Sequence, residues 1–253
     1  MKALLDINLQ EKMQSLYISN EYFISIPKRT EGNDYWSKSK DPDGQERDRT
    51  KEEKLGLEDV QYILDFLHSY FENGRILDIG CGLGWIHKYL QGNFEKFGIE
   101  IDKYASQISG KYCNCINSSF EEEIYPQNYF DCIILNHVIE HFEDPLRVIL
   151  EIKKILKPQG VLIIGTPDFD SGCARHFQGN YRLLHDKTHV SLFSCDSLHR
   201  MLRDYDFRIF KSEFPFFKTR FFNEENLTRL FDTNKVSPPF YGNFMTLFST
   251  NQK

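Results

Sequence analysis

A strand that ends in an acid and a glycine-rich turn is the feature that most constrains the fold of this chain. Residues 75–84 read Arg-Ile-Leu-Asp-Ile-Gly-Cys-Gly-Leu-Gly, so three glycines alternate with other residues after an apolar run. Such a run is typical of a parallel sheet covered on both faces. Glycines let the backbone turn tightly and approach a ligand without obstruction from Cβ. The motif predicts an α/β fold with a nucleotide-type cofactor site, followed by a helix over residues 85–90.

A second acid follows at the distance expected for a ribose ligand. The segment Phe-Gly-Ile-Glu-Ile-Asp at residues 97–102 predicts a second strand, and its Glu100 lies twenty residues after Gly80. An ionised carboxylate at the end of a parallel strand can accept hydrogen bonds from two neighbouring hydroxyl groups. We therefore expect Glu100 to bind a ribose. A solvated acid at a strand end is the alternative.

With these two motifs the chain resembles the class I S-adenosylmethionine-dependent methyltransferases, which show D-x-G-x-G-x-G and then an acid ending the second strand. Residues 130–135, 136–145 and 156–167 are similar to the family's fourth strand, the segment after it, and its fifth strand. The likeness covers about residues 55–215. It is greatest to the branch of ubiquinone-pathway O-methyltransferases and sugar and natural-product methyltransferases. The resemblance implies S-adenosylmethionine as the cofactor.

The resemblance also implies a Rossmann-like three-layer sandwich. Its sheet should have seven mostly parallel strands in the order 3-2-1-4-5-7-6, with the last strand antiparallel. We expect the methyltransferase domain over residues 55–253, with a substrate insertion at about 166–195, and an N-terminal cap over residues 1–54 for which a flexible tail is the alternative. Asn73-Gly74 should end the helix before the first strand. Apolar patterns predict the remaining strands and helices at residues 60–71, 111–116, 145–156, 161–165, 198–205, 207–212 and 244–249.

Nine residues should contact the cofactor. They are Asp78, Gly80, Cys81, Gly82, Gly84, Glu100, Ser119, Phe120 and Asn136. Asp78 should receive the ligand's ammonium, directly or through water, unless it only orients the loop. Ser119 and Phe120 should bond the adenine amine and cover its ring, although the acid common in the family is missing there. Asn136 should lie near the reactive sulfonium.

A histidine is the expected general base. Methyl transfer to a hydroxyl needs a group that accepts a proton near neutral pH, which suits a His. The candidates are His137, His141, His185 and His189. The family branch commonly has a His a few residues before an aromatic-Ser/Thr pair, which selects His189. We expect His189 to act as the base or to orient the acceptor; a structural His bonded to a backbone carbonyl is the alternative.

Two groups of residues could bind a metal, but we predict none. His137, Glu140 and His141 have the i, i+3, i+4 spacing that brings ligands to one helix face, and certain relatives carry Glu, Glu and His there. Bracing of the helix is the alternative. The six cysteines include no C-x-x-C pair and are expected to be reduced apolar fillers. Cys113 and Cys115 are one residue apart, a poor geometry for zinc.

The composition of the chain limits the classes of partner that we expect. The formal net charge of −6 argues against a nucleic-acid surface, because such binding depends on clustered Lys and Arg. The chain has no apolar run of about 18 residues and no charged-then-apolar leader, so we expect it to be cytoplasmic and without a membrane partner. We expect a monomer or homodimer. The phenylalanines of residues 214–222 should pack in the core or cap, with a substrate wall or a dimer interface as alternatives.

We therefore predict a methyltransferase that acts on a small-molecule acceptor. The expected methyl acceptor is a hydroxyl oxygen of a sugar or another biosynthetic intermediate, and N-methylation stays open. A noncatalytic S-adenosylmethionine-binding regulatory or assembly protein is the alternative from another class. A nicotinamide-dependent oxidoreductase would share the glycine loop, but it would need dinucleotide binding.

Overall fold

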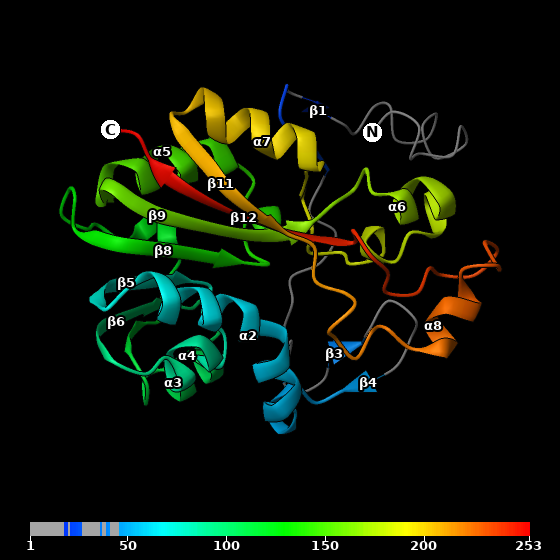
Figure 1. The fold of residues 1–253 in the computed structure, drawn as a ribbon, viewed down its shortest axis with the longest axis horizontal. Coiled ribbons are helices and arrows are strands. Elements are labelled where there is room, and N and C mark those ends of the chain that lie inside the picture. Colours follow the sequence, from blue (N-terminus) through cyan, green and yellow to red (C-terminus); the bar gives the residue numbers. More distant parts are fainter. Residues whose placement is uncertain (1–17, 20, 27–35, 37–38, 41–45) are drawn as a thin grey trace.

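The computed structural model describes residues 18–19, 21–26, 36, 39–40 and 46–253. Its centre is a seven-stranded sheet in the order β11-β12-β9-β8-β5-β6-β7 (Figure 1). The strands are β5 (Asn73–Ile79), β6 (Asn93–Ile99), β7 (Asn114–Ile116), β8 (Phe130–Asn136), β9 (Leu156–Pro167), β11 (Phe207–Glu213) and β12 (Phe244–Asn251). The strands from β5 to β9 pair in parallel, and β12 is antiparallel to both β9 and β11. The predicted order and the antiparallel last strand are confirmed.

Helices cover both faces of this sheet, as the apolar strands required. The helices are α2 (Glu53–Tyr70), α3 (Trp85–Tyr89), α4 (Lys103–Ser109), α5 (Pro145–Ile155), α6 (Gly172–Phe177), α7 (Cys195–Asp204) and α8 (Glu224–Arg229). Along β8, Ile133 packs with α5 and α7 in one apolar cluster. Its neighbour Ile134 points to the other face and packs with α2 and α3 in a second cluster. Alternate residues of one strand therefore contribute to two cores.

Two helix ends test the local sequence signals. Asp144 caps α5, because its side chain accepts a hydrogen bond from the Arg147 N–H, as predicted. The predicted stop at Asn73-Gly74 is wrong. Helix α2 ends at Tyr70, where Phe71 takes an extended backbone, and Asn73 already begins β5.

The described part of the N-terminal segment packs onto the domain. Strand β2 (Ile24–Ser25) pairs with β1 (Ile18–Ser19) and with β10 (Ser191–Leu192). Tyr22 and Phe23 beside β2 are buried in the main core. Strands β3 (Ser39–Lys40) and β4 (Glu46–Arg47) form a separate hairpin. Most of the predicted cap, including Tyr17 and Tyr35, lies outside the described residues, so the cap stays a prediction.

The described residues also form five short 3₁₀ helices. They are η1 (Arg49–Lys51), η2 (Phe120–Glu122), η3 (Ile139–His141), η4 (Gln178–Asn180) and η5 (Arg182–Leu184). Among the described residues, no helix combines the length and the apolar composition that crossing a bilayer requires. The cytoplasmic location stays a prediction.

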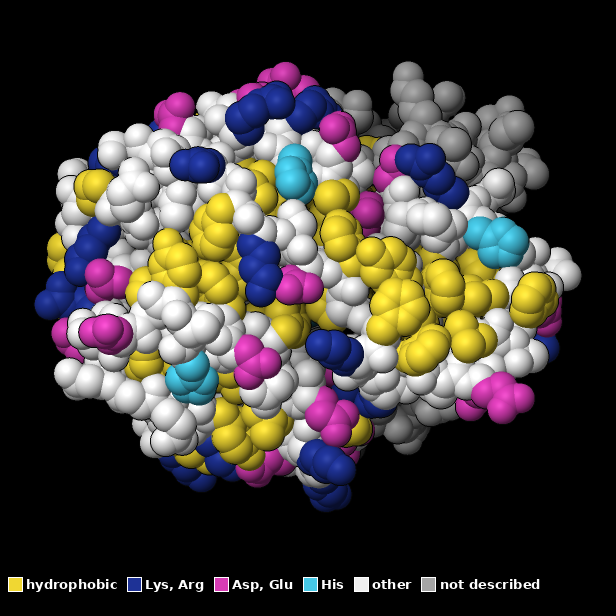
Figure 2. Space-filling model, in the orientation of Figure 1, with side chains coloured by type: hydrophobic (Ala, Val, Ile, Leu, Met, Phe, Trp, Pro, Cys, Tyr) yellow, Lys and Arg dark blue, Asp and Glu magenta, His cyan; other side chains and the backbone are white. Residues whose placement is uncertain are grey.

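Only part of the aromatic cluster predicted at residues 214–222 is buried in the core. Phe216 is buried against Phe217, Phe222 and Phe240. Phe217 and Phe222 themselves remain 61% and 48% exposed. Figure 2 shows hydrophobic side chains on the surface around α8 and the loop before β12.

Candidate functional site

The glycine loop joins β5 to α3 at the carboxyl edge of the sheet. Gly80, Gly82 and Gly84 all have left-handed backbones, with φ of 67°, 54° and 78°. A Cβ on Gly82 would lie 2.4 Å from the Trp36 ring, so this indole packs directly on the loop. A side chain at Gly82 would need both an unfavourable φ and the space that Trp36 fills. Side chains of this chain therefore pack closely against the glycines of the loop, and its contact with a cofactor stays a prediction.

Two buried acids flank this loop. Glu100, at the end of β6, accepts hydrogen bonds from the Gly82 and Asp102 N–H groups, both at 2.8 Å. Burial raises the pKa of Glu100. Burial, and then the neighbouring Glu100 charge, raise the pKa of Asp78 well above its ordinary value. Because burial disfavours the charge on both acids, and Glu100 further disfavours ionisation of Asp78, a cationic ligand would stabilise the pair.

The remaining predicted cofactor residues lie at the ends of β7 and β8. Ser119 is partly exposed and precedes η2 as its N-cap, whereas Phe120 is 3% exposed and packs in the same apolar cluster as α5 and α7. Asn136 ends β8, and its buried Oδ1 has no hydrogen-bond partner in the described part of the chain. Asn117 was missed from the sequence; its Nδ2 donates to the Glu100 and Ile101 carbonyls at 2.8 and 2.9 Å. It fixes the segment that carries Glu100.

A second polar group lies after β8 and β9. His189 is 5% exposed, and its Nδ1 lies 2.9 Å from the Leu183 carbonyl oxygen. A protonated Nδ1 donates this bond, which leaves the Nε2 lone pair free. Nε2 lies 3.7 Å from Asp186 Oδ2 and 4.0 Å from Glu140 Oε1. The backbone thus orients His189 as a proton acceptor.

Glu140 is the fully buried acid of this group. Its Oε2 accepts a hydrogen bond from the Thr166 hydroxyl at 2.9 Å, and its Oε1 lies 3.5 Å from His137 Nδ1. Burial opposes the charge, yet the neighbouring His137, His141 and His189 outweigh it and hold the pKa of Glu140 at about 2. Glu140 is therefore an ionised carboxylate with imidazoles around it.

His189 is held neutral by its surroundings. Burial lowers the pKa of His189, while the Asp186 and Glu140 carboxylates oppose that shift. Asp186 was missed from the sequence, because it lies three positions before His189 in a loop and nothing marks the turn that brings the two side chains together. A neutral imidazole with a free Nε2 is the state that a general base needs.

The same group has metal-ligand geometry. One ligand atom each of Glu140, His141 and His189 lies within 4.8 Å of the others. The sequence suggested His137 in place of His189; His137 instead lies beside Glu140 and edge-on to Phe244. His185 stays outside the group, exposed, with Nε2 3.2 Å from the Gly179 carbonyl oxygen.

Comparisons with known proteins identify the fold. Residues 52–212, more than half of the chain, match a family described as a methyltransferase domain. An uncharacterized protein of Methanocaldococcus jannaschii is 28% identical over 156 residues, which cover 61% of this chain and 75% of that protein. A ubiquinone biosynthesis O-methyltransferase of Cereibacter sphaeroides is 29% identical over 104 residues, 38% of this chain and 42% of that protein. The chain thus spans less than half of that relative.

A solved structure agrees at the level of the fold. An S-adenosylmethionine-dependent methyltransferase from Archaeoglobus fulgidus superimposes with a TM-score of 0.57. It is 21% identical, and the match covers 79% of this chain and 97% of that one. The sheet order and the glycine loop described above are therefore those of a Rossmann-like methyltransferase fold.

Proposed function

Since this chain belongs to the methyltransferase domain family, we propose that it transfers a methyl group from S-adenosylmethionine to a hydroxyl oxygen of a small-molecule acceptor. A sugar or another biosynthetic intermediate is the acceptor class we favour. Relatives that match part of this chain include ubiquinone biosynthesis O-methyltransferases, which supports transfer to oxygen. We propose that neither a nucleic acid nor a membrane is the partner, and that the chain acts as a monomer or homodimer.

The residues around the glycine loop fit this cofactor. S-adenosylmethionine carries a positive ammonium and a positive sulfonium, and its methyl group is already activated for displacement. Asp78 and Glu100 supply two buried acids whose raised pKa values would fall beside a cation. Asn136 supplies a buried oxygen that lacks a partner in the described residues. The chain's own contribution is therefore to bind, orient and exclude water.

The proposal of O-methylation rests on the position of His189. The Leu183 carbonyl oxygen fixes its ring, and Nε2 faces the Glu140 and Asp186 carboxylates. As an acceptor hydroxyl loses its proton to Nε2, those two carboxylates would stabilise the imidazolium that forms. Glu140 and Asp186 are positioning residues in this scheme, because they act through His189.

Trp36 supports the proposed N-terminal cap. Its ring packs on Gly82, and its carbonyl oxygen accepts a hydrogen bond from the Arg49 N–H at 2.9 Å. An indole on the cofactor loop would cover the methionine portion of the ligand and exclude water from it. We propose that residues 1–54 form this lid.

Calorimetric titration with S-adenosylmethionine, S-adenosylhomocysteine and NAD tests the cofactor. We expect micromolar binding of the two sulfur ligands and none of NAD. Binding of NAD alone would favour an oxidoreductase, and binding of no ligand to folded protein would contradict the proposed function. Binding of the sulfur ligands without turnover across an acceptor screen would favour the noncatalytic alternative.

Substitution of His189 tests the base. On an identified acceptor, His189→Ala should lower kcat/KM by about 10² to 10⁴ fold. His185→Ala is the matched control, because His185 is exposed and its Nε2 lies 3.2 Å from a backbone carbonyl oxygen, that of Gly179. Activity of His189→Ala within about threefold of wild type would exclude an acid-base role.

A further inference from the structure

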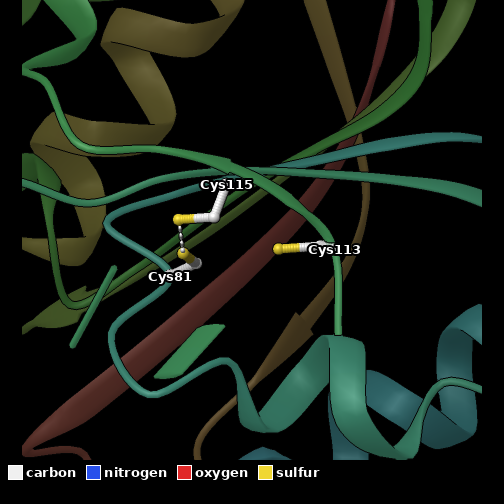
Figure 3. Close-up of side chains that lie close together, drawn as sticks. All are labelled: Cys81, Cys113 and Cys115. Atoms are coloured by element: carbon white, nitrogen blue, oxygen red, sulfur yellow. Dashed lines mark hydrogen bonds between the residues drawn. The ribbon is translucent and has the colours of Figure 1, made fainter. Parts of the chain in front are cut away.

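Three cysteines from different segments meet beside the glycine loop (Figure 3). They are Cys81 in the loop, Cys113 just before β7, and Cys115 within β7. Their sulfur atoms all lie within 4.8 Å of one another, and those of Cys81 and Cys115 are 3.7 Å apart. The sequence suggested only the pair Cys113 and Cys115; the parallel pairing of β5, β6 and β7 brings in the third thiol.

Gly98 keeps the space between these sulfurs open. A Cβ on this residue would lie 2.8 Å from Cys81 Sγ, 2.9 Å from Cys113 Sγ and 3.5 Å from Cys115 Sγ. Gly98 lies inside β6, where its backbone has no left-handed φ that would require a glycine. A glycine is suited to this position because a larger side chain would contact the three sulfur atoms, not because the backbone conformation requires it.

The spacing fits two thiolates on one metal ion. Zinc–sulfur bonds of about 2.3 Å at a tetrahedral angle separate the two sulfurs by about 3.8 Å. The observed 3.7 Å between Cys81 and Cys115 matches that value. A disulfide would need the two sulfurs at about 2.05 Å, so Cys81 and Cys115 are separate thiols.

Hydroxyl groups surround the cluster as outer ligands would. Ser109 Oγ lies 3.1 Å from Cys81 Sγ and 3.4 Å from Cys113 Sγ. Cys115 Sγ lies 3.6 Å from Ser106 Oγ. The Cys115 thiol donates to the Ser106 hydroxyl. Once a thiol loses its proton to bind a metal, a neighbouring hydroxyl can donate to the thiolate and orient it. Cys113 and Cys115 are partly exposed, which gives an ion access and leaves a fourth position for water.

We propose that Cys81, Cys113 and Cys115 form a three-thiolate site for a thiophilic metal ion, with Zn²⁺ as the ion that the geometry fits. Thiolates select soft or borderline ions of this kind over Mg²⁺ or Ca²⁺. Each thiol that binds gives its proton to solvent, so affinity falls as the pH is lowered. The site is separate from Glu140 and His189 and does not depend on methyl transfer.

The site is coupled to the cofactor loop by the chain itself. Cys81 lies between Gly80 and Gly82, and the Glu100 N–H donates to the carbonyl oxygen of Ile116, the residue after Cys115. An ion shared by Cys81 and Cys115 would tie the glycine loop to the strand edge beside Glu100. Metal and cofactor affinities would then change each other by the same factor.

Zinc titration of the reduced, chelator-stripped full chain tests this proposal. Competition with a chromophoric chelator should give one ion per chain, and Cd²⁺ in its place should give a thiolate-to-metal charge-transfer band in the ultraviolet. Cys113→Ser and Cys115→Ser should each weaken Zn²⁺ binding by at least about 100-fold. Cys195→Ser should leave it unchanged, since that partly exposed cysteine lies outside the cluster.

Gly98→Ala is the sharper variant, because it keeps all three thiols and fills the space between them. It should abolish binding of one Zn²⁺ per chain. Gly172→Ala is its control, since a Cβ there meets nothing within 4 Å. If Gly98→Ala fails to fold, the two serine variants carry the test.

Three results would overturn the proposal. The first is no Zn²⁺ binding by the wild type at micromolar concentrations of the ion. The second is binding that survives Cys115→Ser and is lost in His189→Ala, which would move the ion to the histidine group. The third is a Cys81–Cys115 disulfide, seen by mass spectrometry, in chain isolated under a nonthiol reductant.

Discussion

Two regions of the molecule contain buried acids. We call the residues around the glycine loop, with Asp78 and Glu100, the loop side, and the group of Glu140, Asp186 and His189 the histidine side. The pKa values of the acids shift in opposite directions in these two regions. On the loop side, the pKa values of Asp78 and Glu100 are raised, by burial first. On the histidine side, the pKa values of Glu140 and Asp186 are lowered in spite of burial, because imidazoles lie beside them. In the described part of the chain, no basic side chain is among the causes that shift the pKa of Asp78 or Glu100, whereas imidazoles lie beside Glu140. An external cation, such as the proposed cofactor, is therefore suited to the first side.

The two sides also differ in how the chain assembles them. The loop side comes from one continuous motif, residues 78–84, and one acid that ends the next strand. The histidine side combines Glu140 of η3, Thr166 of β9 and His189 before β10. A continuous motif tolerates little change within it, whereas a group assembled from separate segments is stabilised by the contacts between them.

The largest expected effect is the loss of Glu140. Glu140→Ala leaves the Thr166 hydroxyl and the neighbouring imidazoles without their buried carboxylate, so it should lower the free energy of unfolding by about 3 to 5 kcal/mol. Urea unfolding measures this. Glu143→Ala, an exposed acid nearby, should change it by less than about 0.5 kcal/mol. A loss below about 1 kcal/mol for Glu140→Ala would show that the histidine side is not held together by this residue.

Lowering the pH should destabilise the folded chain strongly through His87, which lies just after the glycine loop. This residue of α3 is fully buried, and burial, with a contribution from Lys96, lowers the pKa of His87 to about 4. Below pH 6.5 the unfolded chain takes up a proton that the folded chain refuses, so stability falls as the pH drops to about 4. The loss is about 3 kcal/mol, at about 1.4 kcal/mol per unit.

Urea unfolding between pH 7 and pH 4 measures this slope, and His87→Leu should flatten it. Leucine has no titrating group and suits an apolar environment. An unchanged slope in this variant would mean that other groups carry the acid sensitivity.

Loss of Glu100 should have a smaller effect, on binding. Glu100→Ala removes a carboxylate that accepts a hydrogen bond from the Gly82 N–H. We propose that the same carboxylate binds the ribose. A charged hydrogen bond contributes about 2 kcal/mol, so affinity for S-adenosylhomocysteine should fall about 30-fold. Glu95→Ala, an exposed acid on the same strand, should leave affinity within about twofold. Equal binding by Glu100→Ala and wild type would contradict the ribose role.

The fold was predictable because its signals are local. The apolar strands, the glycine turn and Glu100 each follow from a few adjacent residues, and the family resemblance supplied the strand order. Helix α5 likewise began where Asp144 and Pro145 predicted. The misplaced end of α2 shows the limit of such signals, because Asn73-Gly74 is also compatible with the start of a strand.

The contacts across the sheet were not predictable in the same way. Asp186 and Leu183 reach His189 through the irregular backbone of the insertion, which has no periodicity to interpret. Cys81 meets Cys115 because β5 and β7 flank β6, a relation between strands and not between neighbours in sequence. Side-chain clusters of this kind follow from register and packing, which a single sequence does not specify.

The smallest expected effect concerns the pH response of the histidine side. Burial lowers the pKa of His189, but Asp186 and Glu140 oppose the shift. The unfolded chain still takes up a proton at higher pH than the folded one, so the contribution is complete above about pH 6.5 and is lost as the pH falls. His189→Asn should therefore reduce the slope of unfolding free energy between pH 7 and pH 5 by less than His87→Leu does, with exposed His185→Asn as the control. A slope that becomes steeper in His189→Asn would mean that the carboxylates outweigh burial and that His189 is charged at neutral pH, which would exclude it as the resting base.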